Sequence, residues 1–226
     1  MSSQSLRLLI VGGHGKVAQH LTRHALAHGH TVLPVIRNAA HESDLPRPSS
    51  GGQGKLEPIV ASLEDSSVAQ LSKLFQQHAP NVVVFAAGAG GKGGPERTRA
   101  VDFEGAVKVF DAIEDAQLAK KDDFKRCLLV SAIDSRDTNK APPEWYEEKD
   151  IERSKATRDA IGFYSQMKYE ADKNLSERKT FPWFVLRPGG LTDEPGSGKV
   201  ALGERKTITT PVRDEPDRLT VGLMKH

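Results

Sequence analysis

The chain has 226 residues, and its 32 Lys and Arg against 30 Asp and Glu give a formal net charge of +2. This near balance argues against the strong basic field of a nucleic-acid-binding domain, so no nucleic-acid partner is expected. The single cysteine, Cys127, excludes an internal disulfide framework and indicates a reducing compartment.

The length predicts one domain with a substantial core. The first apolar run, residues 6–11, is interrupted by Arg7 and is too short for a signal sequence. No run elsewhere approaches the roughly 20 apolar residues that a membrane-spanning helix needs. We therefore expect a cytoplasmic protein without a membrane partner, present as a monomer or homodimer.

Apolar runs alternate with amphipathic stretches in the N-terminal half. The Pro-, Ser- and Gly-rich residues 38–56 predict a surface loop within the domain, because the alternation resumes after them. The run over 81–88 is apolar throughout, which is typical of a parallel strand covered on both faces. The pattern predicts strands over 6–12, 30–37, 56–62 and 81–88, and helices over 16–28 and 66–78.

The alternation continues in the C-terminal half, with a polar connection over 134–157. This β-α order with short joints predicts an α/β fold, a Rossmann-type doubly wound parallel sheet, in a single domain over 1–226. Small substrate-side elements are expected at about 134–160 and 188–226. The predicted elements are helices over 96–116 and 162–177, and strands over 126–132 and 183–190.

Three glycines, Gly12, Gly13 and Gly15, separate the first predicted strand from the first predicted helix. Gly12 permits a tight turn, Gly15 leaves room for a pyrophosphate, and Ala18 lets the helix pack closely on the strand. The free amide groups and dipole of the helix favour negative charge. The Gly-x-x-Gly-x-x-Ala spacing predicts a dinucleotide site, with a plain turn as the alternative.

Three other residues of this turn are assigned to the same cofactor site: His14, Lys16 and Val17. An exposed turn residue without a ligand is an equal alternative for His14. His20, His24 and His28 recur every four residues on the first helix, but no carboxylate or cysteine joins them at ligand spacing. No metal site is therefore expected.

The end of the second predicted strand indicates which dinucleotide binds. Arg37 and Asn38 occur there, and no acid follows until Glu42. An NAD site usually has an acid at this point for the ribose 2′-hydroxyl, whereas a forked guanidinium suits a 2′-phosphate. We predict NADP (NADPH) as cofactor in preference to NAD, with a solvated surface arginine as the alternative.

Several stretches together resemble the atypical short-chain dehydrogenase/reductases, of the NAD(P)-binding, NmrA-like and flavin-reductase-like kind. The stretch "LRPGGLTDEPGSGKV" resembles in particular a subgroup of NADP-dependent epimerases or reductases. The matching stretches span about residues 6–200 and are, in order, "VGGHGKVA", "VIRN", "SLED", "VVVFAAGAG", "VDFEGAVKVFDAIEDA", "CLLVSA", "YSQMKYEADKNL" and "FVLRPGGLTDEPGSGKV".

The resemblance implies cofactor contacts from three further segments. Ser62 and Leu63 would lie along the adenine. The segment that would lie beside the ribose and phosphates is Ala86, Ala87 and Gly88. The segment near the nicotinamide would be Pro188, Gly189 and Gly190. The family often has Asp at the position of Ser62.

The resemblance also implies catalytic roles for Tyr164 and Lys168, which lie at i and i+4 on one helix face. The tyrosine would be the general acid or base on the substrate oxygen. The lysine would hold the nicotinamide ribose and, with the cofactor, lower the pKa of the phenol. Ser131 would hold the substrate oxygen, and Asp102 would take a tetrad position that is Asn in the wider family. Alternatively, Ser131 bonds the backbone at the strand end.

Two functional hypotheses follow. The first is an NADP-dependent oxidoreductase or epimerase-like enzyme that acts on a small carbonyl or hydroxyl compound. The second is a non-catalytic NADP-binding redox sensor, as the NmrA-like resemblance implies. Residues 201–226 match the family poorly and hold few apolar positions, so a loop-like tail is expected there. Such a tail would leave the nicotinamide more open to water, which favours the sensor.

Overall fold

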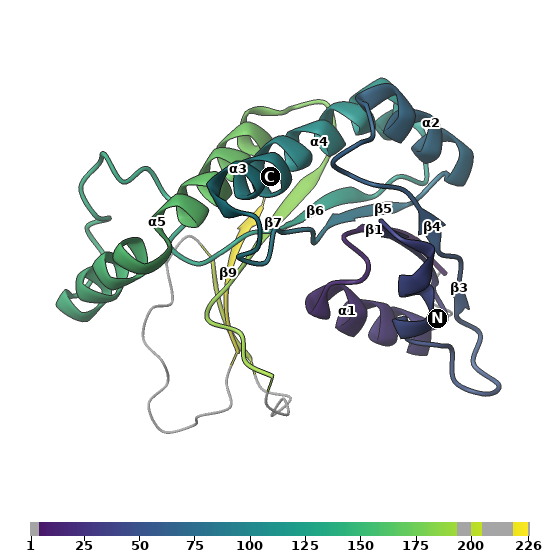
Figure 1. Ribbon diagram of the computed structural model, residues 1–226, viewed down its shortest axis with the longest axis horizontal. Coiled ribbons are helices and arrows are strands. Elements are labelled where there is room, and N and C mark those ends of the chain that lie inside the picture. The colour runs from purple at the N-terminus through teal and green to yellow at the C-terminus, as the bar shows by residue number, and fades with distance from the viewer. Residues whose placement is uncertain (1–4, 194–199, 205–218, 226) are drawn as a thin grey trace.

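The computed structural model describes residues 5–193, 200–204 and 219–225 (Figure 1). The strands form one sheet in the order β3-β2-β1-β5-β6-β7-β9-β8, and β4 also pairs with β2. Their bounds are β1 Arg7–Val11, β2 Thr31–Ile36, β3 Lys55–Leu56, β4 Ile59–Val60, β5 Val82–Phe85, β6 Arg126–Val130, β7 Trp183–Pro188, β8 Val200–Glu204 and β9 Leu219–Lys225.

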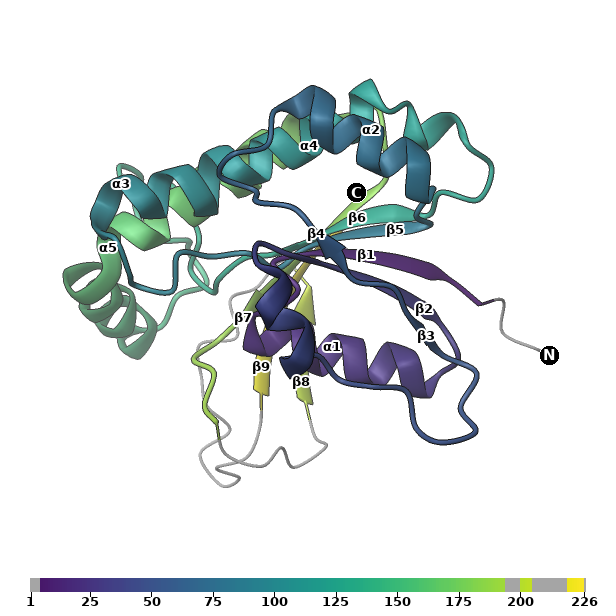
Figure 2. The same cartoon turned by 45° about the vertical axis from the view of Figure 1, so that its right-hand side comes forward.

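Pairing from β3 through β7 is parallel throughout, whereas β9 pairs antiparallel with β7 and parallel with β8. Figure 2 shows α1 on one side of the sheet and α2, α4 and α5 on the other. The predicted Rossmann-type doubly wound fold is confirmed. The helical segments are α1 Lys16–Ala27, η1 Ala39–Asp44, α2 Val68–His78, α3 Gly94–Thr98, η2 Arg99–Glu104, α4 Gly105–Asp115, η3 Leu118–Lys120 and α5 Glu148–Glu177.

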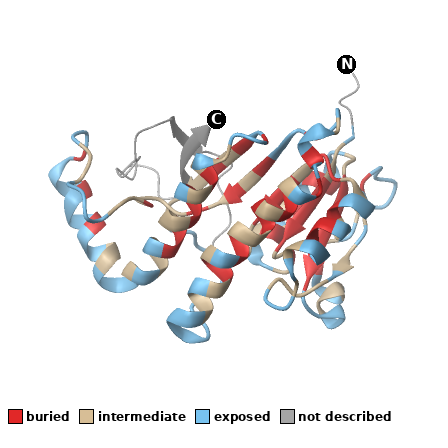
Figure 3. Ribbon diagram, turned by 90° about the horizontal axis from the view of Figure 1, so that it is seen from above, coloured by how far each residue is buried: buried red, intermediate tan, exposed pale blue. Residues whose placement is uncertain are grey.

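Alternate residues of β1 belong to two different cores. Leu9 and Val11 pack in the cluster that includes residues of α2, α4 and α5. Leu8 and Ile10 pack in the cluster that includes residues of α1. A strand points successive side chains to opposite faces, so an uninterrupted apolar strand needs helices on both sides. Figure 3 shows the buried positions on the strands and on the helix faces turned toward them.

Two predicted elements are divided in the structure. The strand predicted over 56–62 is two short strands, β3 and β4, with Pro58 between them, which has no amide hydrogen for a ladder bond. The helix predicted over 96–116 begins earlier, at Gly94, and consists of α3, the π-helical turn η2 and α4. The π-helical turn places Asp102 beside the loop that follows β5, where it accepts the Ala89 amide.

The helix predicted over 162–177 begins much earlier, at Glu148. Residues 148–157, which were predicted as part of a polar connection, are therefore helical. A capping box between Glu147 and Asp150 starts this helix, α5, and Ile161 departs from helical geometry with φ −139° and ψ 33°. Residues 148–160, before the kink, are mostly charged and exposed, and they have no regular apolar face that could pack on the sheet. Figure 1 shows this first part of α5 projecting outward.

The loop-like tail expected after Val200 is wrong for two segments, which form β8 and β9. β9 pairs with the edge of β7, with Leu223 opposite Leu186, and this pairing satisfies backbone groups that an edge strand leaves open. Residues 194–199 and 205–218 of the expected substrate-side segment lie outside the described residues. The assignment of 134–160 and 188–226 to the substrate side stays a prediction.

Candidate functional site

The glycine turn after β1 fits tightly between two neighbouring strands. Gly12 has φ +83°, and a Cβ there would lie 2.6 Å from Cα of Ala87, which follows β5. A Cβ on Gly13 would lie 2.5 Å from Cβ of Pro34 in β2, and the Gly13 amide donates to the Val35 carbonyl at 2.9 Å. Only glycine fits at these two positions, so the turn holds its backbone close to both strands.

Gly15 is the N-cap of α1, and no side chain caps this helix end. The Gly15 amide donates to the Gly12 carbonyl at 2.9 Å, and a Cβ on Gly15 would lie 3.2 Å from the same oxygen. The first amides of α1 therefore keep their hydrogens for an external acceptor, and the helix dipole favours an anion there. This is the chemistry that a dinucleotide diphosphate requires.

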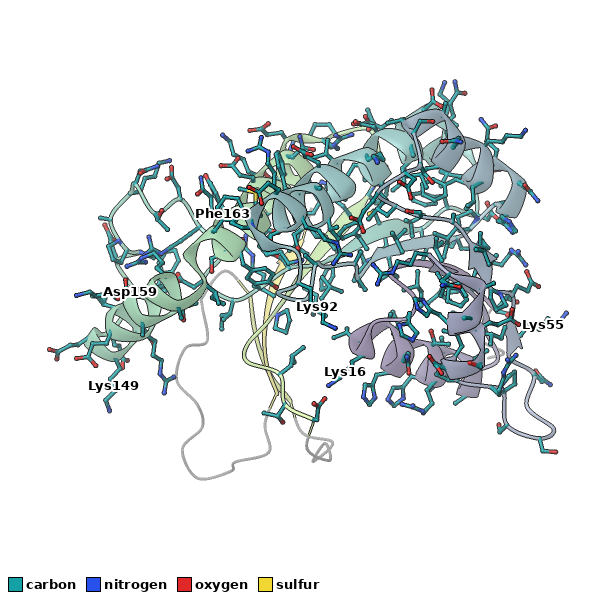
Figure 4. All side chains as sticks on the ribbon, in the orientation of Figure 1. Lys16, Lys55, Lys92, Lys149, Asp159 and Phe163 are labelled. Carbon is teal, nitrogen blue, oxygen red and sulfur yellow. The ribbon has the colours of Figure 1, made fainter. Side chains whose placement is uncertain are left out.

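The glycine turn opens into a cavity of about 550 Å³ beside the ends of β1, β2 and β5. Lys16 at the start of α1 and Lys92 in the loop before α3 both line it and are labelled in Figure 4. Ten of the predicted cofactor residues line this cavity: Gly12, His14, Gly15, Lys16, Arg37, Ser62, Leu63, Ala86, Ala87 and Gly88.

The other predicted cofactor residues are not among those that line the cavity: Gly13, Val17, Asn38, Lys168, Pro188, Gly189 and Gly190. Gly13 is instead packed on β2, and Asn38 accepts the Ala40 amide at 2.9 Å as the N-cap of η1. Polar lining residues that the sequence interpretation did not select are His41, Glu64, Lys92 and Arg97. Glu64 lay in the quoted "SLED" stretch, and Lys92 in the glycine-rich run that extends "AAGAG".

Two arginines flank the carboxylate of Glu64 in the cavity wall. Arg97 binds it through Nε at 3.2 Å and through a terminal nitrogen at 2.9 Å, and this pairing holds the pKa of Glu64 below its usual range. Arg37 lies 4.0 Å from the same carboxylate, and its side chain is 60% exposed. Because Arg97 already pairs with Glu64, Arg37 keeps most of its donors for a ligand.

Two histidines stack in the same wall. The rings of His14 and His41 have centroids 4.0 Å apart and an interplanar angle of 14°. His14 Nε2 lies 2.9 Å from a carboxylate oxygen of Asp44, whereas His41 Nδ1 is buried without a hydrogen-bond partner among the described residues. The His14 side chain is 41% exposed, so both its assignment to the cofactor and the exposed-turn alternative stay open. His41 was missed because it lies in the segment interpreted as a surface loop.

A buried ion pair lies beside the loop that follows β5. Lys168 Nζ is 3.3 Å from Asp102 Oδ1 and donates to the Val130 carbonyl at 3.1 Å. Asp102 Oδ2 accepts the Ala89 amide at 2.9 Å, and a Cβ on Gly88 would lie 3.1 Å from Oδ1. Since Gly88 and Ala89 line the cavity, this pair connects α5 directly to the cavity wall.

Tyr164 lies one turn before Lys168 on α5, with Lys168 Nζ 5.7 Å from the centre of its ring. Burial, followed by the negative charges of Asp102 and Asp172, raises the pKa of Tyr164 to about 12. The resemblance implied that Lys168 and the cofactor together lower this pKa, and that stays a prediction, whereas the protein's own surroundings act in the opposite direction. Asp102 neutralises the lysine charge that was expected to stabilise a phenolate.

Asp172 continues the same face of α5, one turn after Lys168. Its Oδ2 accepts Ser135 Oγ at 2.9 Å and Arg187 Nε at 2.8 Å. Burial, which outweighs the opposing effects of Arg187, Ser131 and Ser135, raises the pKa of Asp172. Ser131 is buried beside it, and its Oγ has no hydrogen-bond partner of standard geometry among the described residues. The alternative in which the Ser131 side chain bonds the strand-end backbone is therefore wrong.

Within the described parts of the chain, no helix is long and apolar enough to cross a membrane. Across the same residues, no group of three or more His, Cys, Asp and Glu side chains is arranged to hold a metal ion.

Comparison with known proteins gives a family and several relatives. The profile of the NAD(P)H-binding family matches residues 12–215. A UPF0659 protein of Schizosaccharomyces pombe is 45% identical over 87% of this chain and 75% of its own length. A Bacillus subtilis protein named as an uncharacterized sugar epimerase is 28% identical over 88% of this chain and 78% of its own length.

Solved structures are similar over the same region. A Bacillus halodurans protein, provisionally named as an NAD-dependent epimerase/dehydratase, has a TM-score of 0.65 and 28% identity over 86% of this chain and 75% of its own. The Bordetella bronchiseptica enzyme WbmG in complex with NAD has a TM-score of 0.55 and 21% identity over 89% of this chain and 54% of its own. The latter likeness supports the fold.

Proposed function

The chain belongs to the NAD(P)H-binding family, as an atypical short-chain dehydrogenase/reductase of the epimerase/dehydratase-like kind, and we propose that it is an NADP-dependent oxidoreductase or epimerase-like enzyme. Its substrate would be a small carbonyl or hydroxyl compound. The observation that carries this proposal is the Asp102–Lys168 pair, which joins the Tyr164 face of α5 to the wall of the dinucleotide cavity.

The residues present fit a dinucleotide. The turn holds Gly12 tightly against Ala87 and has no side chain at Gly15, and the start of α1 offers amides without a side-chain cap. These groups would hold the diphosphate, while Ser62, Leu63 and the loop at Ala87 would border the adenosine half. When bound, the nicotinamide group supplies the hydride acceptor or donor.

We favour NADP because of the charges beside β2. Arg37 is exposed, lines the cavity and has only a distant carboxylate neighbour, Glu64 at 4.0 Å, which Arg97 binds more closely. A forked guanidinium with free donors suits a ribose 2′-phosphate. The first residues after β2 carry no acid that would repel this phosphate.

Tyr164 would transfer the proton at the substrate oxygen. With a pKa of about 12, its phenol is protonated at neutral pH and can donate to a carbonyl oxygen, which favours the direction of reduction. Lys168, held by Asp102 and the Val130 carbonyl, has a fixed ammonium that would hold the ribose hydroxyls. Ser131, which is buried beside Asp172 with no hydrogen bond of standard geometry among the described residues, would donate to the substrate oxygen.

Replacing Tyr164 tests this proposal. Tyr164→Phe should abolish NADPH-dependent reduction of quinones, flavins or aldehydes while NADPH binding persists, because only the hydroxyl is removed. Tyr169→Phe on the same helix is the matched control and should keep its activity. Undiminished turnover in Tyr164→Phe would remove Tyr164 from the mechanism.

A non-catalytic NADP-binding sensor is the second candidate, and one observation favours it. Lys168 is neutralised by Asp102, and the Tyr164 phenol is less acidic than a free tyrosine. Tight NADPH binding with no turnover on any carbonyl, flavin or quinone substrate would support this function. For either function we propose a cytoplasmic monomer or homodimer, which agrees with a thiol, Cys127, that is buried and unpaired.

A further inference from the structure

The stacked imidazoles of His14 and His41 belong to the cavity wall that also carries Arg37. His14 comes from the glycine turn, whereas His41 comes from η1, so two separate segments meet in this stack. Histidine changes its charge between about pH 5 and pH 8. A stack of two such rings beside an exposed guanidinium is therefore a group whose total charge depends on pH and on a bound anion.

Charged groups surround the pair on every segment that lines this part of the cavity. Asp44 of η1 is 2.9 Å from His14 Nε2, and His14 and His41 both lower the pKa of this carboxyl. Glu64 is bound to Arg97, so its charge is already compensated. The remaining charged residues of the cavity lining and of η1 with its following turn are Lys16, Arg37, Lys92, Glu42 and Arg47.

Without a ligand, Asp44 is the one carboxylate that pairs with the stack among the described residues. Two cationic rings with centroids 4.0 Å apart would repel each other. His41 Nδ1 is also buried without a partner among the described residues. A doubly negative phosphate in the cavity would reverse this balance, because it attracts a second proton to the stack.

We propose that His14 and His41 form a proton-coupled recognition element for a ribose 2′-phosphate. Binding of a dinucleotide that carries this phosphate takes up a proton at the stacked rings, whereas a dinucleotide without it does not. This inference rests on the proposed binding of NADP beside Arg37. It adds that the preference for NADPH over NADH increases as the pH falls, by at most about tenfold per pH unit for one proton taken up.

Calorimetric titration of the full chain tests this inference without any turnover. NADPH, NADH and the fragments 2′,5′-ADP and 5′-AMP are titrated from about pH 6 to about pH 8, the range in which imidazoles titrate. Two buffers of different ionisation enthalpy are used, so that the protons taken up are counted. We expect more proton uptake with NADPH than with NADH, and more with 2′,5′-ADP than with 5′-AMP. The phosphate has its own ionisation near pH 6, so each result is compared between variants.

His41→Gln should remove most of the uptake and flatten the pH dependence of NADPH affinity, and a control, His24→Gln on the exposed face of α1, should change neither. Asp44→Asn should increase the proton uptake on binding, because the carboxylate that pairs with His14 before the ligand binds is removed. Uptake that is equal in His41→Gln and the unaltered chain, or equal for NADPH and NADH, would overturn the inference while the proposed function stands. Failure of both dinucleotides to bind would overturn both.

Discussion

Asp102 and Lys168 form an ion pair of 3.3 Å in which the aspartate side chain is 1% exposed and the lysine side chain 5% exposed. They come from different helical segments, η2 and α5, and they meet beside the carboxyl ends of β5 and β6. The resemblance alone implied a lysine committed to the cofactor. In the structure the lysine has a protein counter-charge, and the same aspartate contributes, after burial, to the raised pKa of Tyr164.

Removing one partner of this pair should destabilise the fold strongly. Asp102→Ala leaves a buried ammonium without its counter-charge and the Ala89 amide without its acceptor. We expect a loss of about 3–5 kcal/mol in the free energy of unfolding, measured by urea denaturation. The double variant Asp102→Ala, Lys168→Met should lose less than the sum of the losses in Asp102→Ala and Lys168→Met. Additive losses would show that the two groups do not interact.

The acidity of Tyr164 should depend on the same aspartate. Asp102→Asn removes a negative charge that opposes the phenolate, so the pKa of Tyr164 should fall from about 12 toward the ordinary value of tyrosine. Ultraviolet titration measures this, and subtraction of the Tyr164→Phe spectrum isolates one phenol among the three tyrosines. The variant Asp159→Asn, on the first part of α5, is the control. A pKa that does not move in Asp102→Asn would contradict the electrostatic account.

The predicted strands that carry the glycine turn were accurate because their signals are local. The apolar run of β1, the three glycines and the amphipathic α1 each follow from a few neighbouring residues. The first part of α5 was missed for a physical reason. Its residues pack little on the sheet, so no apolar period marks the helix, and the capping box at Glu147 is its main local signal.

Many residues that line the cavity were predicted as cofactor residues, but several of its charged and titratable residues were not. Arg37, which follows a recognisable strand, was predicted as a cofactor residue and lines the cavity, whereas its role toward the cofactor stays a prediction. His41 and Arg97 were missed, because each lies on a short helix, η1 or α3, whose direction depends on tertiary packing. The raised pKa of Tyr164 was not predicted for a related reason: burial and the nearby charges of Asp102 and Asp172 raise it, and the spacing of residues in the chain contains no such information.

Gly12 and Gly51 both have a left-handed backbone, but only at Gly12 would an added Cβ clash with other atoms. Substitutions at the two positions therefore distinguish the cost of a steric clash from the cost of backbone strain. Gly12 has φ +83°, and a Cβ added there would lie 2.6 Å from Ala87 Cα, whereas Gly51 has φ +80° with nothing within 4 Å of such a Cβ. Gly51→Ala should cost about 1–2 kcal/mol of unfolding free energy through its left-handed backbone alone. Gly12→Ala should cost clearly more and should abolish NADPH binding, because the turn must move away from β5. Thermal unfolding and calorimetry measure both, and equal losses in the two variants would contradict the tight packing of the turn.

Arg37 should discriminate between the two dinucleotides, and Arg47 offers a closely matched control. Both side chains are 60% exposed, and each lies 4.0 Å from a glutamate, but only Arg37 lines the cavity. Arg37→Ala should weaken NADPH binding by about 10- to 100-fold, the loss typical of a hydrogen-bonded charge. NADH affinity should change little, because NADH has no 2′-phosphate, and Arg47→Ala should leave both affinities unchanged. Equal weakening of NADPH and NADH by Arg37→Ala would mean that this guanidinium does not bind the 2′-phosphate, and the choice of NADP over NAD would then lose its structural basis.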